Sequence, residues 1–345
     1  MLAHLRTHLT SWLDRQWQQQ GWLCWLMMPF SLFVLCVLSV RRLFYRIFSS
    51  CVYRAPVPVV VVGNIYVGGT GKTPTVIALV ESLKKTGWHP GVISRGYGIR
   101  IGKLARTGCV DIKAEQFGDE PALISAETGA PISVHPNRKL AIQTLLKQFP
   151  DVNVIISDDG LQHLALARDV AIVVQDARGI GNGRVMPAGP LRESADRIHS
   201  VDAILTQNVI PAILPVDSQV KQLTLQLEIR HLRHLKSGQT ITLSEFKKRF
   251  HHQSLGAAAG IGSPEKFFNS LRHAGISLSN TLALPDHHAI TNSTFDRLAN
   301  RVILITAKDA IKCKGLADER LWVVDVRSVL SDPDFAGWLN QKLKN

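Results

Sequence analysis

A glycine-rich loop between a strand-like run and a helix-like run limits the fold of this chain more than any other feature. The run from Val57 to Val62 has the apolar, β-branched character of a buried strand. After the loop, apolar residues recur at helical spacing as far as Leu83. The loop itself reads Gly68-Gly69-Thr70-Gly71-Lys72-Thr73, and Pro74 suits the first turn of the helix that follows. A strand, a glycine loop and a helix in this order are typical of a phosphate-binding loop.

Each residue type in this loop has a use in phosphate binding. Glycines let consecutive backbone N–H groups turn toward an anion, and the start of the helix adds its positive dipole. Lys72 would bring a point charge to the phosphates, and the Thr73 hydroxyl could hold Mg²⁺. The strict Walker A pattern fails by one residue, because Tyr66 stands where that pattern has glycine. The alternative, a glycine turn without a ligand, is disfavoured by the order of the surrounding elements.

The charge of the chain indicates an anionic partner. The net charge is +13 over 345 residues, which fits nucleic acid, an anionic membrane surface or a phosphorylated substrate. No lysine-rich tail or RNA-binding signature is found, so no nucleic acid partner is expected. The five cysteines are scattered without metal-ligand spacing, which favours a reducing compartment.

The N-terminal 54 residues predict a membrane-associated helical segment. The run from Trp22 to Val40 carries no charge, and a helix of its 19 residues would reach roughly 28 Å, close to a bilayer's hydrocarbon thickness. Arginines follow it directly, which by the positive-inside tendency leaves the rest of the chain in the cytoplasm. Whether the segment spans the bilayer or lies in its surface stays open, and a buried core hairpin is the alternative. Ahead of the run, one helical face collects Leu2, Leu5, Leu9, Trp12 and Leu13.

The remainder of the chain predicts two α/β domains. From residue 55 to about 208, strand-like runs alternate with helical patterns, as in a mostly parallel sheet covered on both faces. From 209 to 345 the sequence pattern changes to a linker-like stretch, which is followed by a smaller set of predicted strands and helices. The strands expected in the first domain are Val57 to Val62, Gly91 to Ser94, Val152 to Ser157, Val170 to Val174 and Val201 to Leu205. Those expected in the second are Leu223 to Ile229, Arg301 to Thr306 and Leu321 to Val326.

Polar clusters follow several of the predicted strands, where open α/β sheets bind ligands. Asp158 and Asp159 have the layout of a Walker B metal site, with a simple acidic turn as the alternative. Arg95 lies in a second glycine loop, and its guanidinium could donate two hydrogen bonds to a phosphate. Asp119 could accept a proton or merely cap a helix. The long loop from Gly179 to Glu193 is predicted to bind a ligand.

A histidine cluster in the second predicted domain adds a candidate for proton transfer. Asp286, His287 and His288 follow Pro285 with no metal-ligand partner nearby in the sequence. A lone histidine is usually structural, but this group could handle protons. The glycine turn from Gly260 to Gly262 lacks a lysine and is interpreted as architecture.

Together these motifs resemble the tetraacyldisaccharide 4'-kinase family, the lipid A kinases of Gram-negative bacteria. The resemblance spans the chain and rests on the phosphate loop, Asp158-Asp159-Gly160, Asp286-His287-His288 and four further stretches. These are Ser94-Arg95-Gly96-Tyr97, Gly118-Asp119-Glu120-Pro121, His135-Pro136-Asn137-Arg138 and Pro187-Ala188-Gly189-Pro190-Leu191-Arg192-Glu193.

The resemblance implies an inner-membrane kinase with a P-loop core and a smaller C-terminal domain, both on the cytoplasmic side. It would use ATP and Mg²⁺ to phosphorylate the 4'-hydroxyl of a tetraacyldisaccharide 1-phosphate, giving lipid IVA. Acyl-chain preference and oligomeric state stay open. The rival interpretation is a membrane-bound P-loop ATPase that acts as a switch or carrier.

The family's motifs also imply residue roles. The loop residues Gly68, Gly69, Thr70, Gly71, Lys72 and Thr73 would bind the nucleotide, while Thr73, Asp158 and Asp159 would hold the metal. Asp119 would be the general base with His287 as its partner, and Lys72 would act in catalysis. Substrate-binding roles fall on Asn64, Arg95, Arg138, Arg192 and Glu193. Three departures from the family pattern are Tyr66, Leu161 and Ala307, the last in place of a glutamate.

Overall fold

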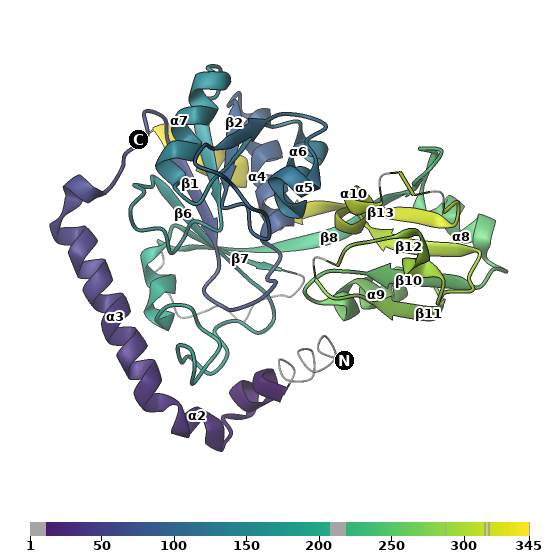
Figure 1. Cartoon of the computed structure of the whole chain (residues 1–345), viewed down its shortest axis with the longest axis horizontal. Helices are drawn as coiled ribbons and strands as arrows, with labels where there is room; N and C mark the ends of the chain where they lie inside the picture. The colour runs from purple at the N-terminus through teal and green to yellow at the C-terminus, as the bar shows by residue number, and fades with distance from the viewer. Residues whose placement is uncertain (1–11, 208–218, 287, 314, 317, 345) are drawn as a thin grey trace.

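The chain forms two lobes joined by a pair of long strands, with a helical arm at the N-terminus (Figure 1). We call residues 53–207 with 335–344 the core lobe, residues 235–320 the C-terminal lobe and residues 12–51 the N-terminal arm. The long strands between the lobes are β8 (Lys221–His234) and β13 (Leu321–Leu330). The computed structural model describes residues 12–207, 219–286, 288–313, 315–316 and 318–344.

The core lobe is a mostly parallel sheet with helices on both faces, as the sequence predicts. Apolar β-branched runs form its central strands, which are buried on both sides. The strands are β1 (Val59–Gly63), β2 (Pro90–Ser94), β3 (Arg106–Gly108), β4 (Ile132–Val134), β5 (Val154–Asp158), β6 (Val170–Gln175) and β7 (Ala203–Gln207). The helices are α4 (Lys72–Lys85), α5 (Ala114–Phe117), α6 (Asp119–Thr128), α7 (Arg138–Gln148) and the 3₁₀ turn η2 (Ala195–Ser200).

The C-terminal lobe repeats the α/β arrangement on a smaller scale. Its strands are β9 (Thr240–Ile241), β10 (Leu255–Ala259), β11 (Leu278–Ala283) and β12 (Val302–Thr306). Its helices are α8 (Leu243–Phe250), α9 (Pro264–His273) and α10 (Ala307–Lys312), with the 3₁₀ turn η3 (Asn292–Phe295). The last helix, α11 (Phe335–Lys344), returns to the core lobe and buries Phe335, Leu339 and Leu343 against the same apolar cluster as α4.

One continuous sheet of thirteen strands runs through both lobes in the order β11-β10-β12-β13-β8-β7-β6-β1-β5-β2-β4-β3, with β9 paired to β8. The strands pair in parallel except where β8 meets β13 and β9 and where β3 meets β4. In the β8–β13 pair the register shifts between Asp325 and Val326. A bulge of this kind bends and twists a strand pair. This one lies where the two lobes join.

The N-terminal arm differs from the single helix predicted over Trp22 to Val40. The arm breaks into α2 (Trp22–Leu26) and α3 (Met28–Ile47), because Pro29 can begin a helix but cannot continue one. A short 3₁₀ turn, η1 (Ser49–Cys51), leads on to the core lobe. The alternative of a buried hairpin is wrong, since Ser31 is the buried residue of α3 and most of its large apolar side chains are exposed. Leu2, Leu5 and Leu9 lie outside the described residues.

Among the described residues, α3 is long and apolar enough to cross a membrane, by length and composition. Its solvent-facing side chains include Phe30, Leu32, Phe33, Val40 and Ile47. A contiguous apolar surface of this kind marks a membrane or protein interaction site.

Candidate active site

The phosphate-binding loop lies at the carboxyl end of β1, in the middle of the core sheet. Gly68 and Gly71 have φ angles of 98° and 86°, in the left-handed region that favours glycine. A Cβ at Gly71 would also meet the side chain of Gln207 at 2.2 Å. Gly71 is the N-cap of α4, and Lys72 and Thr73 are the first two helical residues. The predicted order of strand, glycine loop and helix is therefore confirmed, with the positive end of α4 at the loop.

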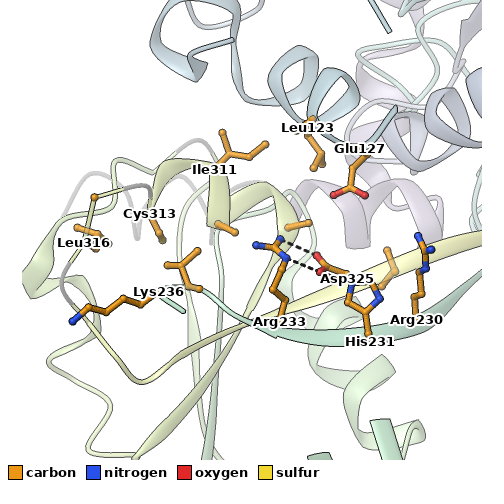
Figure 2. Close-up of a pocket in the computed structure, with 16 residues that line it drawn as sticks. Leu123, Glu127, Arg230, His231, Arg233, Lys236, Ile311, Cys313, Leu316 and Asp325 are labelled. Carbon is orange, nitrogen blue, oxygen red and sulfur yellow. Dashed lines mark hydrogen bonds and ion pairs between the residues drawn. The ribbon is translucent and has the colours of Figure 1, made fainter. Parts of the chain in front are cut away.

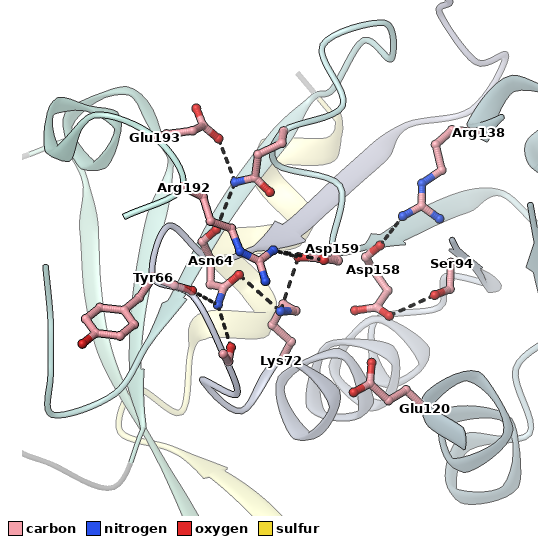
Figure 3. A network of polar contacts seen from close by, with 12 residues as sticks. Asn64, Tyr66, Lys72, Ser94, Glu120, Arg138, Asp158, Asp159, Arg192 and Glu193 are labelled. Carbon is pink, nitrogen blue, oxygen red and sulfur yellow. Dashed lines mark hydrogen bonds and ion pairs between the residues drawn. The ribbon is translucent and has the colours of Figure 1, made fainter. Parts of the chain in front are cut away.

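Asn64 and Asp159 hold the lysine of this loop in place (Figure 3). The Lys72 ammonium donates to Oδ1 of Asn64 at 3.2 Å and lies 3.3 Å from Oδ1 of Asp159. The amide of Asn64 donates to the carbonyls of Tyr66 and Gly68, at 2.6 and 3.2 Å. Asn64 is fully buried, so this side chain fixes both the loop backbone and the lysine. Its contacts here are with the loop itself.

The paired aspartates have different environments. Asp158 is the last residue of β5 and is buried, and burial raises its pKa to about 7, with Glu120 adding to the rise. Burial acts in the same direction on Asp159, but Lys72 and Arg192 outweigh it and hold the pKa of Asp159 below its ordinary value. Ser94 donates to Oδ2 of Asp158 at 3.2 Å, whereas Oδ1 has no hydrogen-bond partner among the described residues.

Three arginines predicted to bind substrate occupy different positions. Arg138 is buried, and its Nη2 donates to the carbonyl of Asp158 at 2.6 Å, so it holds the end of β5. Burial lowers the pKa of Arg138 to about 10. Arg192 lies 3.3 Å from Asp159, and Arg95 is exposed. Arg95 is thus the most accessible of the three to a ligand in solution.

Glu193 connects the N-terminal arm to the phosphate loop. Its Oε2 accepts from Arg42 of α3 at 2.5 Å, and its Oε1 accepts from Gln162 at 2.8 Å. The same Gln162 nitrogen donates to the carbonyl of Asn64 at 3.0 Å. A chain of polar contacts therefore runs from the arm through Glu193 and Gln162 to Asn64, the residue that holds Lys72. Figure 3 shows Glu193, Asn64 and Lys72 of this chain. The sequence analysis missed Gln162, because a glutamine in a turn carries no distinctive signal.

The loop that ends at Glu193 lies between the arm and the phosphate loop. Ser31 of α3 donates to the carbonyl of Val185 and accepts from the backbone of Ala188, both at 2.8 Å. On its other side, the backbone N–H of Val67 donates to Pro190 at 2.9 Å. The guanidinium of Arg184 stacks over the ring of Trp25 at 4.3 Å. Within this loop Arg184 therefore contacts the arm.

Asp119 and Glu120 begin α6 and face the site from the other side of the phosphate loop. The N-cap of α6 is Gly118, so the alternative that Asp119 serves as the N-cap residue is wrong. Glu120 lies close enough to Asp158 to raise its pKa, and Figure 3 shows the two carboxyl groups near each other. His287, the predicted partner of Asp119, lies outside the described residues.

The glycine turn of the C-terminal lobe, interpreted above as architecture, lies against the phosphate loop. A Cβ at Gly262 would come within 3.7 Å of the backbone nitrogen of Gly69. Next to this contact, Lys266 of α9 lies 2.5 Å from Asp176, which follows β6. Arg178 pairs with the same carboxylate at 2.8 Å and donates to the carbonyl of Gly69 at 3.1 Å. The C-terminal lobe thus lies against the phosphate loop.

The three departures from the family pattern are accommodated in different ways. Tyr66 is buried, with the guanidinium of Arg178 over its ring at 4.2 Å. Leu161 is fully buried, in contact distance of Gly63. Ala307 lines a cavity of about 820 Å³ between the lobes, which Figure 2 shows. None of the phosphate-loop residues lines that cavity.

A P-loop at the carboxyl end of a parallel sheet, two aspartates beside its lysine and further acids facing them define the class of P-loop phosphotransferases. Residues 23–344 match the family model of tetraacyldisaccharide-1-P 4'-kinases. The chain therefore belongs to this family.

Individual relatives support the assignment. A tetraacyldisaccharide 4'-kinase of Bordetella parapertussis is 53% identical over 334 residues, covering 96% of each chain. One from Haemophilus influenzae is 42% identical over 312 residues, covering 90% of each chain. The crystal structure of LpxK from Aquifex aeolicus in complex with ATP has a TM-score of 0.77 at 25% identity, covering 93% of this chain and 99% of that one. The predicted P-loop α/β fold and kinase function are confirmed.

Proposed function

We propose that this chain transfers the γ-phosphoryl group of ATP to the 4'-hydroxyl of a tetraacylated disaccharide 1-phosphate, giving lipid IVA. The observation that carries the proposal is the convergence of Lys72, the Asp158–Asp159 pair and the acids of α6 at one edge of the sheet. Phosphoryl transfer needs charge neutralisation, alignment and a carboxylate that accepts the hydroxyl proton. These side chains are suited to each task. The names of the relatives supply the substrate class.

The nucleotide would bind at the loop from Gly68 to Thr73. Backbone N–H groups of the loop and the start of α4 would contact the phosphates, and Lys72 would neutralise charge on the transferred group. Lys72 already lies beside Asp159, so binding would exchange a carboxylate partner for a phosphate. Arg178 and Lys266 add positive charge along the same side of the loop, both close to Asp176.

Mg²⁺ would be held by Thr73 and the aspartates. Among the described residues, no group of three or more His, Cys, Asp or Glu side chains could hold a metal ion by itself. This suits Mg²⁺ in kinases, which takes one or two carboxylates together with nucleotide phosphates and waters. Oδ1 of Asp158 is buried without a hydrogen-bond partner among the described residues, so it fits a metal-ligand role better than Asp159, which is paired with Lys72 and Arg192. An ion held there would supply positive charge to stabilise the phosphates during transfer.

Asp119 would act as the general base. As the 4'-oxygen attacks the γ-phosphorus, its proton passes to the Asp119 carboxylate, and the bond to the β-phosphate oxygen breaks as ADP leaves. Two contacts support a role in proton transfer for the loop that contains Asp286 and His288. Lys308 pairs with Asp286, and Lys312 donates to the carbonyl of His288. The same two lysines reach Glu120 and Asp119. In this proposal His287, which lies between Asp286 and His288 in the sequence, shares the accepted proton with Asp119.

The test combines product analysis with one substitution. With radiolabelled ATP and the acylated disaccharide in mixed micelles, label should move to the lipid, whereas release of free phosphate alone would indicate an ATPase. Asp119→Asn should lower kcat at least a hundredfold, in the range of lost acid–base catalysis, with little change in the KM for ATP. An Asp119→Asn protein with normal turnover would remove Asp119 as the base. Glu115→Gln, which changes an exposed acid of α5, is the matched control.

We also propose that the enzyme associates with the inner membrane through the N-terminal segment up to residue 54, with both lobes in the cytoplasm. The exposed apolar surface of α3 and the arginines that follow support this placement. In this view residues 55–208 bind the nucleotide, and the part after 208 closes over it and returns α11 to the core lobe. Anionic lipid headgroups, rather than nucleic acid, would account for the basic charge.

Membrane association can be tested by charge on the apolar surface. Phe33→Glu with Val40→Glu should move the full-length protein from the membrane fraction toward the supernatant, because both side chains are exposed on α3. Val110→Glu places the same charge on an exposed apolar residue of the core lobe and should leave the distribution unchanged. A doubly substituted protein that pellets as fully as the wild type would contradict the anchor.

A further inference from the structure

We propose that Lys308 and Lys312 of α10 are positioning residues for the transfer reaction. They bring two positive charges from the C-terminal lobe onto Asp119 and Glu120 of the core lobe. The acceptor side of the site is then assembled only when the two lobes are together. This inference rests on the proposed role of Asp119 as the base.

Lys312 makes the contact with the predicted base. Its Nζ lies 3.6 Å from Oδ2 of Asp119 and 3.3 Å from Oδ1 of Asp309, a residue of its own helix. It also donates to the carbonyl of His288 at 3.4 Å. Only 10% of the Lys312 side chain and 13% of the Asp119 side chain are exposed. The pair is therefore largely desolvated, unlike a surface ion pair.

Lys308 makes the corresponding contact one helical turn earlier. Its Nζ lies 3.4 Å from Oε1 of Glu120 and 3.1 Å from Oδ1 of Asp286, and 12% of its side chain is exposed. Glu120 and Asp286 hold the pKa of Lys308 above its ordinary value, although burial acts to lower it. The two lysines are four residues apart and so project from one face of α10. That face meets adjacent acids at the start of α6.

The neighbouring face of α10 lies beside a cavity. Ala307 and Ile311 line the cavity between the lobes, together with Leu123 and Glu127 of α6 (Figure 2). A cavity at this point means that close apolar packing does not fix α10 against α6 along its whole length. The ion pairs are specific contacts between these two helices, so they contribute to how the helices are placed against each other.

Contacts within the C-terminal lobe hold α10 itself in place. The hydroxyl of Thr306 caps the helix by accepting from the backbone N–H of Asp309 at 3.1 Å. The Asp309 carboxylate in turn accepts from the backbone N–H of Gly260 at 3.0 Å. Gly260 begins the turn whose Gly262 contacts the phosphate loop. The helix that carries both lysines is thus tied to the segment that closes over the nucleotide.

The energetics favour a positioning role over a purely stabilising one. A buried ion pair adds little net stability, because desolvation of both charges offsets their attraction. What such a pair does is fix geometry, and a misplacement of about 1 Å in a reacting group can cost roughly a hundredfold in rate. Loss of a lysine that holds Asp119 in place should therefore lower kcat, and it should also lower the melting temperature because a largely buried carboxylate loses one of its partners.

The experiment measures steady-state kinetics and thermal midpoints on the full-length protein. Lys312→Met should lower kcat about ten- to a hundredfold and leave the KM for ATP within about twofold. Its thermal midpoint should also fall, because Asp119 and Asp309 lose a buried partner. Lys308→Met should have a smaller effect in the same direction. Lys312→Arg, which keeps the charge, should recover most of the lost kcat. The control is Lys342→Met, which breaks the Lys342–Asp202 pair of the core lobe and should leave kcat unchanged.

A double substitution separates this inference from the assignment of the base. If Lys312 acts through Asp119, the protein with both Lys312→Met and Asp119→Asn should be no slower than Asp119→Asn alone. If Lys312→Met has a normal kcat while Asp119→Asn is inactive, the positioning role is wrong and Asp119 remains the proposed base. Fully multiplicative losses would overturn it as well. Normal turnover of Asp119→Asn, by contrast, would refute the proposed base itself.

Discussion

The two sides of the candidate site are built in different ways. On the phosphate side, Asn64, Lys72 and Asp159 all belong to the core lobe, and their contacts are short and within that lobe. On the acceptor side, Asp119 and Glu120 receive their cations from α10 of the other lobe. The contacts that hold Lys72 therefore depend on the fold of one lobe, whereas the cations of the acceptor side depend on how the two lobes meet.

This difference has a consequence for catalysis. A site that is complete only when the lobes are together can bind ATP first and align the base afterwards, which limits wasteful hydrolysis before the acceptor is in place. The bulge in the β8–β13 pair lies at the junction where such a motion would be absorbed. Substitutions on the two sides should therefore change different kinetic constants.

The largest effect is expected on the phosphate side, from Lys72→Ala. Loss of the ammonium leaves charge on the transferred group unneutralised, which typically costs about 10²- to 10³-fold in kcat. The thermal midpoint should fall only modestly, because Asp159 keeps its ion pair with Arg192. Lys85→Ala, at the exposed far end of the same helix, should keep full turnover. A folded Lys72→Ala enzyme with near normal kcat would contradict the phosphate-loop role.

The same contrast explains which parts of the site the sequence predicts. The main residues of the phosphate side are close together in the sequence, so a strand, a glycine loop and Lys72 could be recognised as one motif. Asp119 was found through its Gly-Asp-Glu-Pro motif. Lys308 was not found, because it lies 188 residues from its partner Glu120 and no local pattern marks a lysine that binds across lobes.

Within the fold, too, features that depend on neighbouring residues could be predicted, whereas features that depend on distant segments could not. Every strand predicted in the core lobe is present, with ends shifted by at most a few residues, since apolar β-branched runs identify buried strands locally. The continuity of one sheet through β8 and β13 was not foreseen, because strand order depends on contacts between distant segments. The break at Met27 was missed because composition alone guided the prediction of the arm, although Pro29 signals the start of a second helix.

A smaller effect is expected where the arm meets the phosphate side. Gln162→Leu removes both hydrogen bonds that connect Glu193 to Asn64, so kcat should fall roughly tenfold, the scale of one or two lost hydrogen bonds. Arg42→Met should cost less, because Arg197 lies 3.6 Å from the same Glu193 oxygen and can partly replace it. Steady-state kinetics in lipid vesicles would rank the two variants.

The control for this comparison is Arg54→Met, which removes an exposed ion pair with Asp169. It should leave kcat unchanged, since exposed pairs contribute little. Equal losses in all three variants would mean that the arm affects the enzyme through general stability, and not through the polar chain that ends at Lys72.

A pH effect should reveal the positive charge around the phosphate side. Burial, and after it Arg138, Arg41 and Arg168, lowers the pKa of His163 to about 4. In the unfolded chain this histidine should titrate near 6.5, so between pH 6.5 and 4 the unfolded state binds more protons. The stability contribution of neutral His163 is therefore present above pH 6.5 and is lost as the pH falls toward 4.

Thermal midpoints measured across this range test the prediction. The wild type should lose stability as the pH falls from 6.5 to 4, and His163→Asn should show a shallower decline. His251→Asn, which alters an exposed histidine of the C-terminal lobe, should follow the wild-type curve. Parallel curves for wild type and His163→Asn would indicate that His163 titrates normally in the folded protein.

The smallest effect is expected from Ala307→Glu, which restores the glutamate that the family pattern has at this position. Ala307 lines the cavity between the lobes, on a face of α10 next to that of the two lysines, so a longer side chain has space there. Arg233 lines the same cavity and could pair with the new carboxylate, although it already binds Asp325 at 3.0 Å. We therefore expect kcat to stay within about twofold of wild type, with a change in thermal midpoint of only a few degrees, because a partly solvated ion pair is worth about 1 kcal/mol or less. Ala307→Lys is the matched control, since a cation facing Arg233 should lower the midpoint. A kcat loss as large as that of Lys312→Met would show that this face of α10 also bears on the acceptor side, and that the contrast between its two faces is wrong.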